Sequence, residues 1–109
     1  MKKYCLALDL KDDEALIAEY ERMHREVWPE IIASIKNADV RNLEIYRTGT
    51  RLFMIMEVTD DFSFERKAAM DAANEKVQEW ENLMWNYQQA LPKSKPDEKW
   101  VLMNKIFVL

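Results

Sequence analysis

The chain contains a single glycine, and its position constrains the fold more than any other feature. Gly49 lies in Thr48-Gly49-Thr50, between two strand-like segments at residues 40–48 and 51–59. Because glycine tolerates the positive φ of a tight turn, we expect these segments to form an antiparallel hairpin. With one glycine in 109 residues, the chain also has no glycine-rich loop of the kind that cradles phosphates.

The spacing of apolar residues predicts the other elements. Residues 3–10 alternate between two faces, as a strand does, and Asp12 and Asp13 then open a helix. Pro29 lacks a backbone donor, which predicts a kink near residues 25–29 of that helix. In chain order we expect a strand over 3–10, a kinked helix over 13–36, strands over 40–48 and 51–59, helices over 63–72 and 74–90 with Asn74 as a cap, an exposed loop over 92–97 and a strand over 99–108.

This order is β-α-β-β-α-β with the second helix split, and the length suits one domain over residues 1–109. It predicts a ferredoxin-like α+β fold, an antiparallel sheet with helices on one face. The strands at 51–59 and 99–108 are apolar on both faces, so something must cover the face without helices. A second copy of the sheet is the simplest cover. We therefore expect a symmetric homodimer, a dimeric α+β barrel.

Charge and cysteine content restrict the partners and the compartment. The net charge is −4 and both signs are mixed along the chain, which argues against nucleic-acid or membrane partners and favours a small neutral ligand. Cys5 has no second cysteine to pair with, which is typical of a reducing compartment. We see no signal peptide and no apolar stretch long enough for a membrane span, so we expect a cytoplasmic protein.

His24 is the one histidine. On a helical wheel it falls within the apolar face formed by Tyr20, Val27 and Ile31. Three interpretations remain open: a core histidine bonded to a backbone carbonyl, a general acid/base in a cleft, or a metal ligand. A zinc site is disfavoured, because one histidine without paired cysteines supplies too few ligands.

Four tryptophans are many for a chain of this length. Each can fill the core, and each can also offer its ring face to the apolar C–H face of a sugar. Trp80 lies on the apolar stripe of the predicted 74–90 helix, whereas Trp85 falls about 120° from the centre of that stripe. Trp85 is therefore a candidate for a pocket rim or a partner contact. The four are Trp28, Trp80, Trp85 and Trp100.

The segment from Tyr20 to Glu30 resembles the signature Y-x-x-x-H-x-x-x-W-P-E of the L-rhamnose mutarotase family, which includes L-fucose mutarotases. The similarity extends over essentially the whole chain, including Asn42–Tyr46, Trp80–Trp85 and the closing Ile106–Leu109. The resemblance implies a dimeric ferredoxin-like enzyme that interconverts the α and β anomers of a 6-deoxy-hexose. Mutarotation involves no redox change, so no cofactor is expected, and the shortage of ligands already argues against a metal.

The resemblance also implies roles for single residues. His24 is expected to be the acid/base catalyst and Tyr20 a sugar contact or second proton carrier. Trp80 is expected in the pocket. Apart from the resemblance, Trp28, Tyr46 and Trp85 are the remaining candidates for substrate contacts, and strand alternation places Tyr46 on the face opposite Leu43 and Ile45. Relatives can carry a tyrosine where this chain has Leu43, and a second tryptophan where it has Glu81. These departures leave the choice between L-rhamnose and L-fucose open.

Two other functions suit the same pattern. Small dimeric α+β barrels also include monooxygenases and haem-degrading enzymes, in which His24 would serve as a haem ligand. A haem or flavin absorption band in the purified protein would favour that class. The second alternative is a non-catalytic sugar-binding module, which binds without turnover. The titratable His24 argues against it, because a pure binding site needs no such group.

Overall fold

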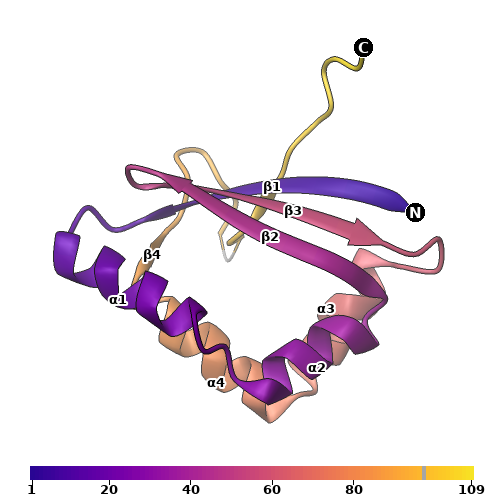
Figure 1. Cartoon of the computed structure of the whole chain (residues 1–109), viewed down its shortest axis with the longest axis horizontal. Helices are drawn as coiled ribbons and strands as arrows, with labels where there is room; N and C mark the ends of the chain where they lie inside the picture. The colour runs from indigo at the N-terminus through magenta and orange to yellow at the C-terminus, as the bar shows by residue number, and fades with distance from the viewer. Residues whose placement is uncertain (97) are drawn as a thin grey trace.

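The computed structural model describes residues 1–96 and 98–109, and it has two layers. An antiparallel sheet forms one layer, and the helices of this described part all lie on one of its faces (Figure 1). The elements in chain order are β1 (Lys2–Leu10), α1 (Glu14–His24), α2 (Pro29–Asn37), β2 (Val40–Thr48), β3 (Arg51–Val58), α3 (Phe64–Ala72), α4 (Glu75–Met84), β4 (Gln88–Gln89) and β5 (Val101–Leu102).

The sheet has the order β2-β3-β1-β4, and β5 also pairs with β1. Gly49 has a φ of 57° in the turn between β2 and β3, so the predicted hairpin is confirmed. Both β4 and β5 run antiparallel to β1, at different points along that strand. With β4 and β5 counted as the last strand position, the order is the ferredoxin-like one, and the predicted α+β class is confirmed.

Helix-facing side chains of the sheet form the core. Alternate residues of β1 and β3 point at the helices, and Leu8 and Val58 are fully buried there. One cluster joins the sheet to α1, α2 and α4, and a second lies under the other end of the sheet. The first cluster contains Leu10, Tyr20, Ile31, Leu52, Val77, Trp80 and Met84. This cluster packs α1 against α4 through Tyr20 and Trp80.

The predicted kinked helix over 13–36 is wrong, because the structure has two separate helices there. α1 ends at His24, residues 25–28 are not helical, and α2 begins at Pro29. The residue before a proline is pushed out of the helical region, and Trp28 has a ψ of 136°. Proline is also favoured at the first position of a helix, where no backbone donor is needed. The proline therefore starts a new helix instead of bending the old one.

The predictions for the last third of the chain need two corrections. The helix expected over 74–90 ends at Met84, and Gln88 and Gln89 then pair with β1 as β4. The strand expected over 99–108 is reduced to Val101–Leu102. Both are short because they share one edge of β1, where β4 pairs near its end and β5 nearer its middle. Of the predicted 92–97 loop, Asp97 lies outside the described residues, and Pro92, Lys93, Lys95 and Pro96 are exposed.

The outer face of the sheet is the one opposite the helices (Figure 1). By strand register the middle of this face carries Cys5, Ala7, Phe53, Ile55 and Val101. The charged pairs Lys3–Glu57 and Asp9–Arg51 lie on the same face, toward the ends of β1. After β5 the chain leaves the sheet on this side (Figure 1), and its last four residues, Ile106 to Leu109, are apolar and exposed. The described part of the chain thus leaves an apolar surface without a cover.

Candidate active site

His24 and Tyr20 lie on the last turn of α1, with ring centroids 4.3 Å apart. The Asp13 side chain accepts a hydrogen bond from the Leu16 backbone N–H and starts this helix. His24 Nδ1 lies 2.8 Å from the Tyr20 carbonyl oxygen, which can only accept a hydrogen bond. Nδ1 therefore carries the proton, and the lone pair of the neutral imidazole is on Nε2.

The contact of Nδ1 matches the interpretation of His24 as a core histidine bonded to a backbone carbonyl. It is also compatible with a role as a general acid/base. A structural bond at Nδ1 leaves Nε2 as a proton acceptor. Burial lowers the pKa of the His24 imidazole below its ordinary value, while the bond to Tyr20 works against that shift. The imidazole is thus neutral near pH 7, which is the form that a general base requires.

Tyr20 is buried, and its hydroxyl belongs to a short polar chain. Gln88 Nε2 donates to Tyr20 Oη at 3.2 Å, and Gln88 itself is 5% exposed. Burial raises the pKa of the Tyr20 phenol, and the bond from Gln88 opposes that rise. The phenol therefore stays protonated near pH 7.

Trp80 forms the aromatic wall of the site. Its ring lies edge-on to that of His24, with centroids 5.6 Å apart, and edge-on to that of Trp28 at 5.0 Å. Trp80 is buried on α4, whose first turn is capped by the Asn74 side chain. Trp28 precedes α2, so the break between α1 and α2 positions this ring against α4. Edge-to-face pairs of this kind hold aromatic rings in defined orientations.

These residues line two cavities. The first, which we call the histidine cavity, has a volume of about 410 Å³ and includes Tyr20 and His24 in its lining. Its other walls come from β2, β3 and the charged residues Glu21, Arg25 and Arg47. Arg47 forms an ion pair with Glu21, which ties β2 to α1 at the edge of the cavity. The histidine cavity thus has an imidazole ring in its lining and charged residues beside it.

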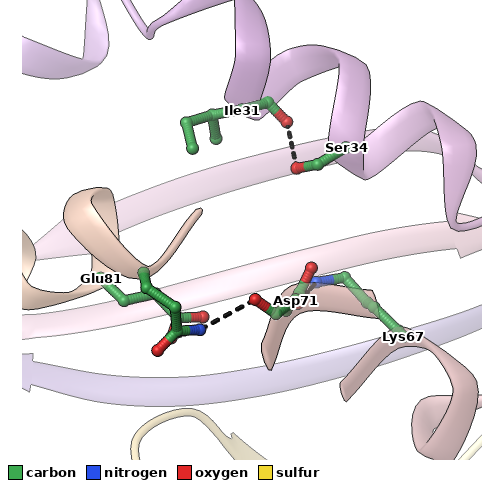
Figure 2. Close-up of polar contacts among 6 residues, drawn as sticks. Ile31, Ser34, Lys67, Asp71 and Glu81 are labelled. Atoms are coloured by element: carbon green, nitrogen blue, oxygen red, sulfur yellow. Dashed lines mark hydrogen bonds and ion pairs between the residues drawn. The ribbon is translucent and has the colours of Figure 1, made fainter. Parts of the chain in front are cut away.

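The second, which we call the tryptophan cavity, has a volume of about 310 Å³. Its floor is apolar and buried, with Leu6, Met56 and Met84 beside Trp80. Its rim is polar, and Figure 2 shows part of it, with Ser34 of α2 across from Lys67 and Asp71 of α3. Lys67 Nζ and Asp71 Oδ2 are 2.7 Å apart, so the two charges at this rim neutralise each other.

The structure brings together four of the six predicted site residues. Tyr20, His24, Trp80 and Trp28 form one continuous aromatic contact chain. Tyr46 contributes to the lining of the histidine cavity, but it is 53% exposed and its register with Phe53 places it on the outer face. Trp85 lines neither cavity, and Lys99 Nζ lies 4.8 Å from its ring centroid.

Gln88 is a polar residue of the site that the sequence pattern did not indicate. The predicted helix over 74–90 placed it on a regular helical turn, whereas the chain reverses after Met84 and Gln88 pairs with Leu10 of β1. The one sequence signal is that Gln88 and Gln89 follow Tyr87 at the end of the apolar stripe. Two polar amides at that point are consistent with the end of a helix.

The described residues contain no cluster of three or more His, Cys, Asp or Glu side chains suited to a metal ion. In the same part of the chain, no helix combines the length and the apolar character needed to cross a membrane.

Two solved structures share the fold over the whole chain. L-rhamnose mutarotase FA22100 from Formosa agariphila aligns with a TM-score of 0.74 at 20% identity, covering 100% of this chain and 99% of that one. Tetracenomycin F2 cyclase from Streptomyces glaucescens aligns with a TM-score of 0.61 at 13% identity, covering 100% and 97%. These two likenesses show the fold alone, since one fold carries several activities.

Sequence comparisons identify the family. The family model for L-rhamnose mutarotase matches residues 3–109. An L-fucose mutarotase from Xanthomonas campestris is 52% identical, with the alignment covering 100% of this chain and 89% of that protein. An L-rhamnose mutarotase from Paraburkholderia phymatum is 33% identical over 72% of this chain and 68% of its own. This chain therefore belongs to the L-rhamnose mutarotase family, whose mutarotases are carbohydrate isomerases.

Proposed function

We propose that the protein interconverts the α and β anomers of a 6-deoxy-hexose, with His24 as the acid/base catalyst. The observation that carries this proposal is the His24 imidazole, whose Nδ1 is held by the Tyr20 carbonyl, so that the lone pair is on Nε2, and whose ring lines a cavity. L-fucose is the first substrate to test and L-rhamnose the second, because the relative at 52% identity is an L-fucose mutarotase. Family membership favours this function over a monooxygenase or a binding module.

The proposed reaction needs two proton transfers. His24 Nε2 accepts the proton of the anomeric O1–H, the C1–O5 bond breaks, and the ring oxygen receives a proton from the Tyr20 hydroxyl. The open-chain aldehyde then turns about its C1–C2 bond and closes from the other face. On closure O1 takes back the proton from His24, and Tyr20 regains its proton from the O5 hydroxyl. A positioned acid or base of this kind contributes about 10²–10⁴-fold to a rate.

The aromatic residues are proposed to hold the sugar during this exchange. Trp80 lies 5.6 Å from His24 between ring centroids, so a pyranose beside Nε2 lies within reach of the Trp80 ring. Trp28 supports Trp80 edge-on. Tyr46 belongs to the lining of the histidine cavity, but its side chain lies on the outer face of the sheet, so it is not among the proposed sugar contacts. Trp85 lines neither cavity, so it is not among the proposed sugar contacts.

Saturation-transfer NMR on equilibrated sugars tests this function, because it measures exchange between anomers without disturbing their equilibrium. The wild type is expected to accelerate exchange of L-fucose or L-rhamnose. A folded His24→Ala variant is expected to lose that acceleration, and Tyr20→Phe to lose less of it, because water can replace the phenol as proton donor. Exchange by His24→Ala at the wild-type rate would show that another group is the catalyst.

We also infer that two copies pair through their outer faces. The helices lie on the other face of the sheet, and the outer face carries Phe53, Ile55 and Val101 (Figure 1). The apolar residues Ile106 to Leu109 extend beyond this face. Ile106 is 95% exposed, which is unusual for a large aliphatic side chain. A second copy would bury both the face and the tail.

A further inference from the structure

The ion pair of Glu21 and Arg47 is a fixed pair of charges in the lining of the histidine cavity. Arg47 Nε donates to Glu21 Oε1, and Arg47 Nη1 donates to the Gly49 carbonyl at 2.7 Å. One guanidinium nitrogen is thus held by α1 and a second by the hairpin turn. The third, Nη2, and the other carboxylate oxygen, Glu21 Oε2, have no hydrogen-bond partner among the described residues.

The ion pair is open to a ligand. The Arg47 side chain is 34% exposed and the Glu21 side chain is 42% exposed, so neither is enclosed in the core. In the strand register Arg47 pairs with the buried Leu52, which places it on the helix side of the sheet. The ion pair therefore stays accessible in a dimer that covers the outer face.

The ion pair also lies beside the proposed catalyst. Glu21 precedes His24 by three positions on α1, so their side chains are neighbours on the helix. Both belong, together with Arg47, to the lining of one cavity of about 410 Å³, a volume within the range of small-molecule sites. A sugar whose anomeric carbon is at His24 can thus contact the ion pair without leaving this cavity.

The chemistry of the ion pair matches sugar hydroxyls. A guanidinium can only donate hydrogen bonds, a carboxylate can only accept them, and a hydroxyl does both. Two neighbouring ring hydroxyls can therefore bind at once, one accepting from Arg47 Nη2 and the other donating to Glu21 Oε2. Hydrogen bonds to charged groups are stronger than those between neutral groups. A neutral ligand is favoured over an anion, because the carboxylate already neutralises the guanidinium.

Arg25 is the third charged residue of this lining, and it differs from Arg47. It is exposed, and its guanidinium forms no ion pair among the residues that the structure describes. A side chain that its ligand must first order loses rotamer freedom on binding, which weakens the contact. Arg47 is held in place before a ligand arrives, so it is the better donor to a hydroxyl.

We propose that Glu21 and Arg47 together bind two neighbouring hydroxyls of the sugar that do not react, and so determine which sugars the enzyme accepts. The proposal rests on the proposed mutarotase function and deepens it. A sugar that lacks one of these hydroxyls leaves a charged group of the ion pair without its partner in the bound state. Discrimination against such sugars is the expected consequence.

The test uses sugars that lack single hydroxyls. Anomer exchange is measured for the faster of L-fucose and L-rhamnose and for its 2-, 3- and 4-deoxy forms, each relative to its spontaneous rate. The 3-hydroxyl belongs to every neighbouring pair among positions 2, 3 and 4, so the wild-type kcat/KM for the 3-deoxy sugar should fall by about 10–100-fold. One of the 2- and 4-deoxy sugars is expected to fall with it, and the other to stay near the parent.

Variants connect this discrimination to the ion pair. Because each residue holds the other in place, either Arg47→Met or Glu21→Met is expected to bring the parent and the 3-deoxy sugar to nearly equal kcat/KM. The loss should appear as a higher KM for the parent, since the lost contacts are to hydroxyls that do not react. Arg22→Met breaks the exposed Glu19–Arg22 pair of the same helix, which lines neither cavity, and is the matched control. It is expected to keep the wild-type discrimination.

A purely structural role of the ion pair predicts a different result. Loosening β2 from α1 would lower kcat/KM for all four sugars by the same factor and leave the discrimination unchanged, which would overturn the proposal. A wild type that treats the three deoxy sugars like the parent would also overturn it, and this measurement does not depend on the folding of a variant. A wild type that accelerates no sugar would overturn the mutarotase function and this inference with it, whereas acceleration without discrimination overturns this inference alone.

Discussion

Burial acts in opposite directions on the two ionisable groups of the site. It lowers the pKa of His24 and raises the pKa of Tyr20, and both effects favour the neutral form. A neutral base and a neutral acid with ring centroids 4.3 Å apart form a pair that can move two protons without building up charge first. The tilted contact of the two rings on one helical turn is therefore the feature on which the proposed chemistry depends.

The lowered pKa of His24 predicts how activity depends on pH. Protonation removes the base, so kcat/KM should fall as pH decreases through the pKa of the folded protein, which lies below the ordinary 6.5. His24 is the one histidine, so its imidazole C–H resonance in proton NMR gives that pKa directly. The kinetic and NMR values are expected to coincide. A loss of kcat/KM centred above pH 6.5 would contradict the assignment.

The lowered pKa of His24 also makes the free energy of unfolding depend on pH, and the direction of the pKa shift gives the direction of that dependence. Between the folded pKa and 6.5 the unfolded chain binds more protons at His24 than the folded chain does. The free energy of unfolding should therefore decrease as pH falls through that window. The decrease should be absent in His24→Asn, which cannot titrate. Urea denaturation of both proteins across the window measures the difference.

Single residues differ in how far the sequence could predict them. Tyr20 and His24 are four positions apart on an amphipathic helix, and the helical wheel alone places both on its apolar face. The role of Gln88 depends instead on a chain reversal after Met84, which brings β4 beside Leu10. Local periodicity has no information about such a reversal, because the pairing partner lies far earlier in the chain.

At the scale of elements, α4 is the helix that carries the aromatic wall, and its first turn depends on Asn74. The Asn74 Oδ1 accepts from the backbone N–H groups of Lys76 and Val77, at 3.0 and 3.3 Å. Asn74→Ala is expected to lower the free energy of unfolding by about 1 kcal/mol, because two helix donors lose their partner. Urea denaturation measures this, and the activity of the folded fraction should not change.

The cap of α3 offers a matched control. The Ser63 side chain accepts from the Arg66 N–H at 3.2 Å, but α3 has no buried residue, whereas α4 buries Val77, Trp80 and Met84. Ser63→Ala should therefore cost less than Asn74→Ala, since α3 can fray without exposing core. A larger loss for Ser63→Ala would show that α3 contributes more to the core than its burial indicates.

Element boundaries were predictable where a local signal marks them. Asp13, Ser63 and Asn74 are caps followed by helices, and Gly49 marks the hairpin. Pro29 marks an interruption of the helix, but the sequence pattern alone does not distinguish a kinked helix from a break. The break is favoured here because Trp28 packs edge-on against Trp80, a contact between distant segments. Tertiary packing thus decides what the proline does locally.

At the scale of the whole molecule, the two faces of the sheet differ, because helices cover one face and the described residues do not cover the other. Helices cover the inner face, and the outer face keeps aromatic and aliphatic side chains with no layer over them among the described residues. A small domain buries a limited share of its surface, so covering this face would add stability that one copy lacks. The sequence pattern predicts strands at residues 51–59 and 99–108 that are apolar on both faces. The pattern also predicts a strand after Leu102, but only Val101 and Leu102 form a strand beside β1, and the Met103 N–H adds one hydrogen bond to the Cys5 carbonyl.

The final prediction concerns this outer face. Phe53 lies between Ala7 and Tyr46 in the strand register, near the middle of the sheet, so a charge there would be buried without a counter-ion in a face-to-face dimer. The wild type is expected to sediment with the mass of two chains, and Phe53→Glu with the mass of one, while its circular dichroism stays that of the folded protein. Ile32→Glu places the same charge on an exposed apolar residue of α2, on the helix side, and should leave the dimer intact. A wild type with the mass of one chain at micromolar concentration would show that the protein does not pair. A Phe53→Glu variant that keeps the mass of two would show that another surface or the tail alone accounts for the assembly.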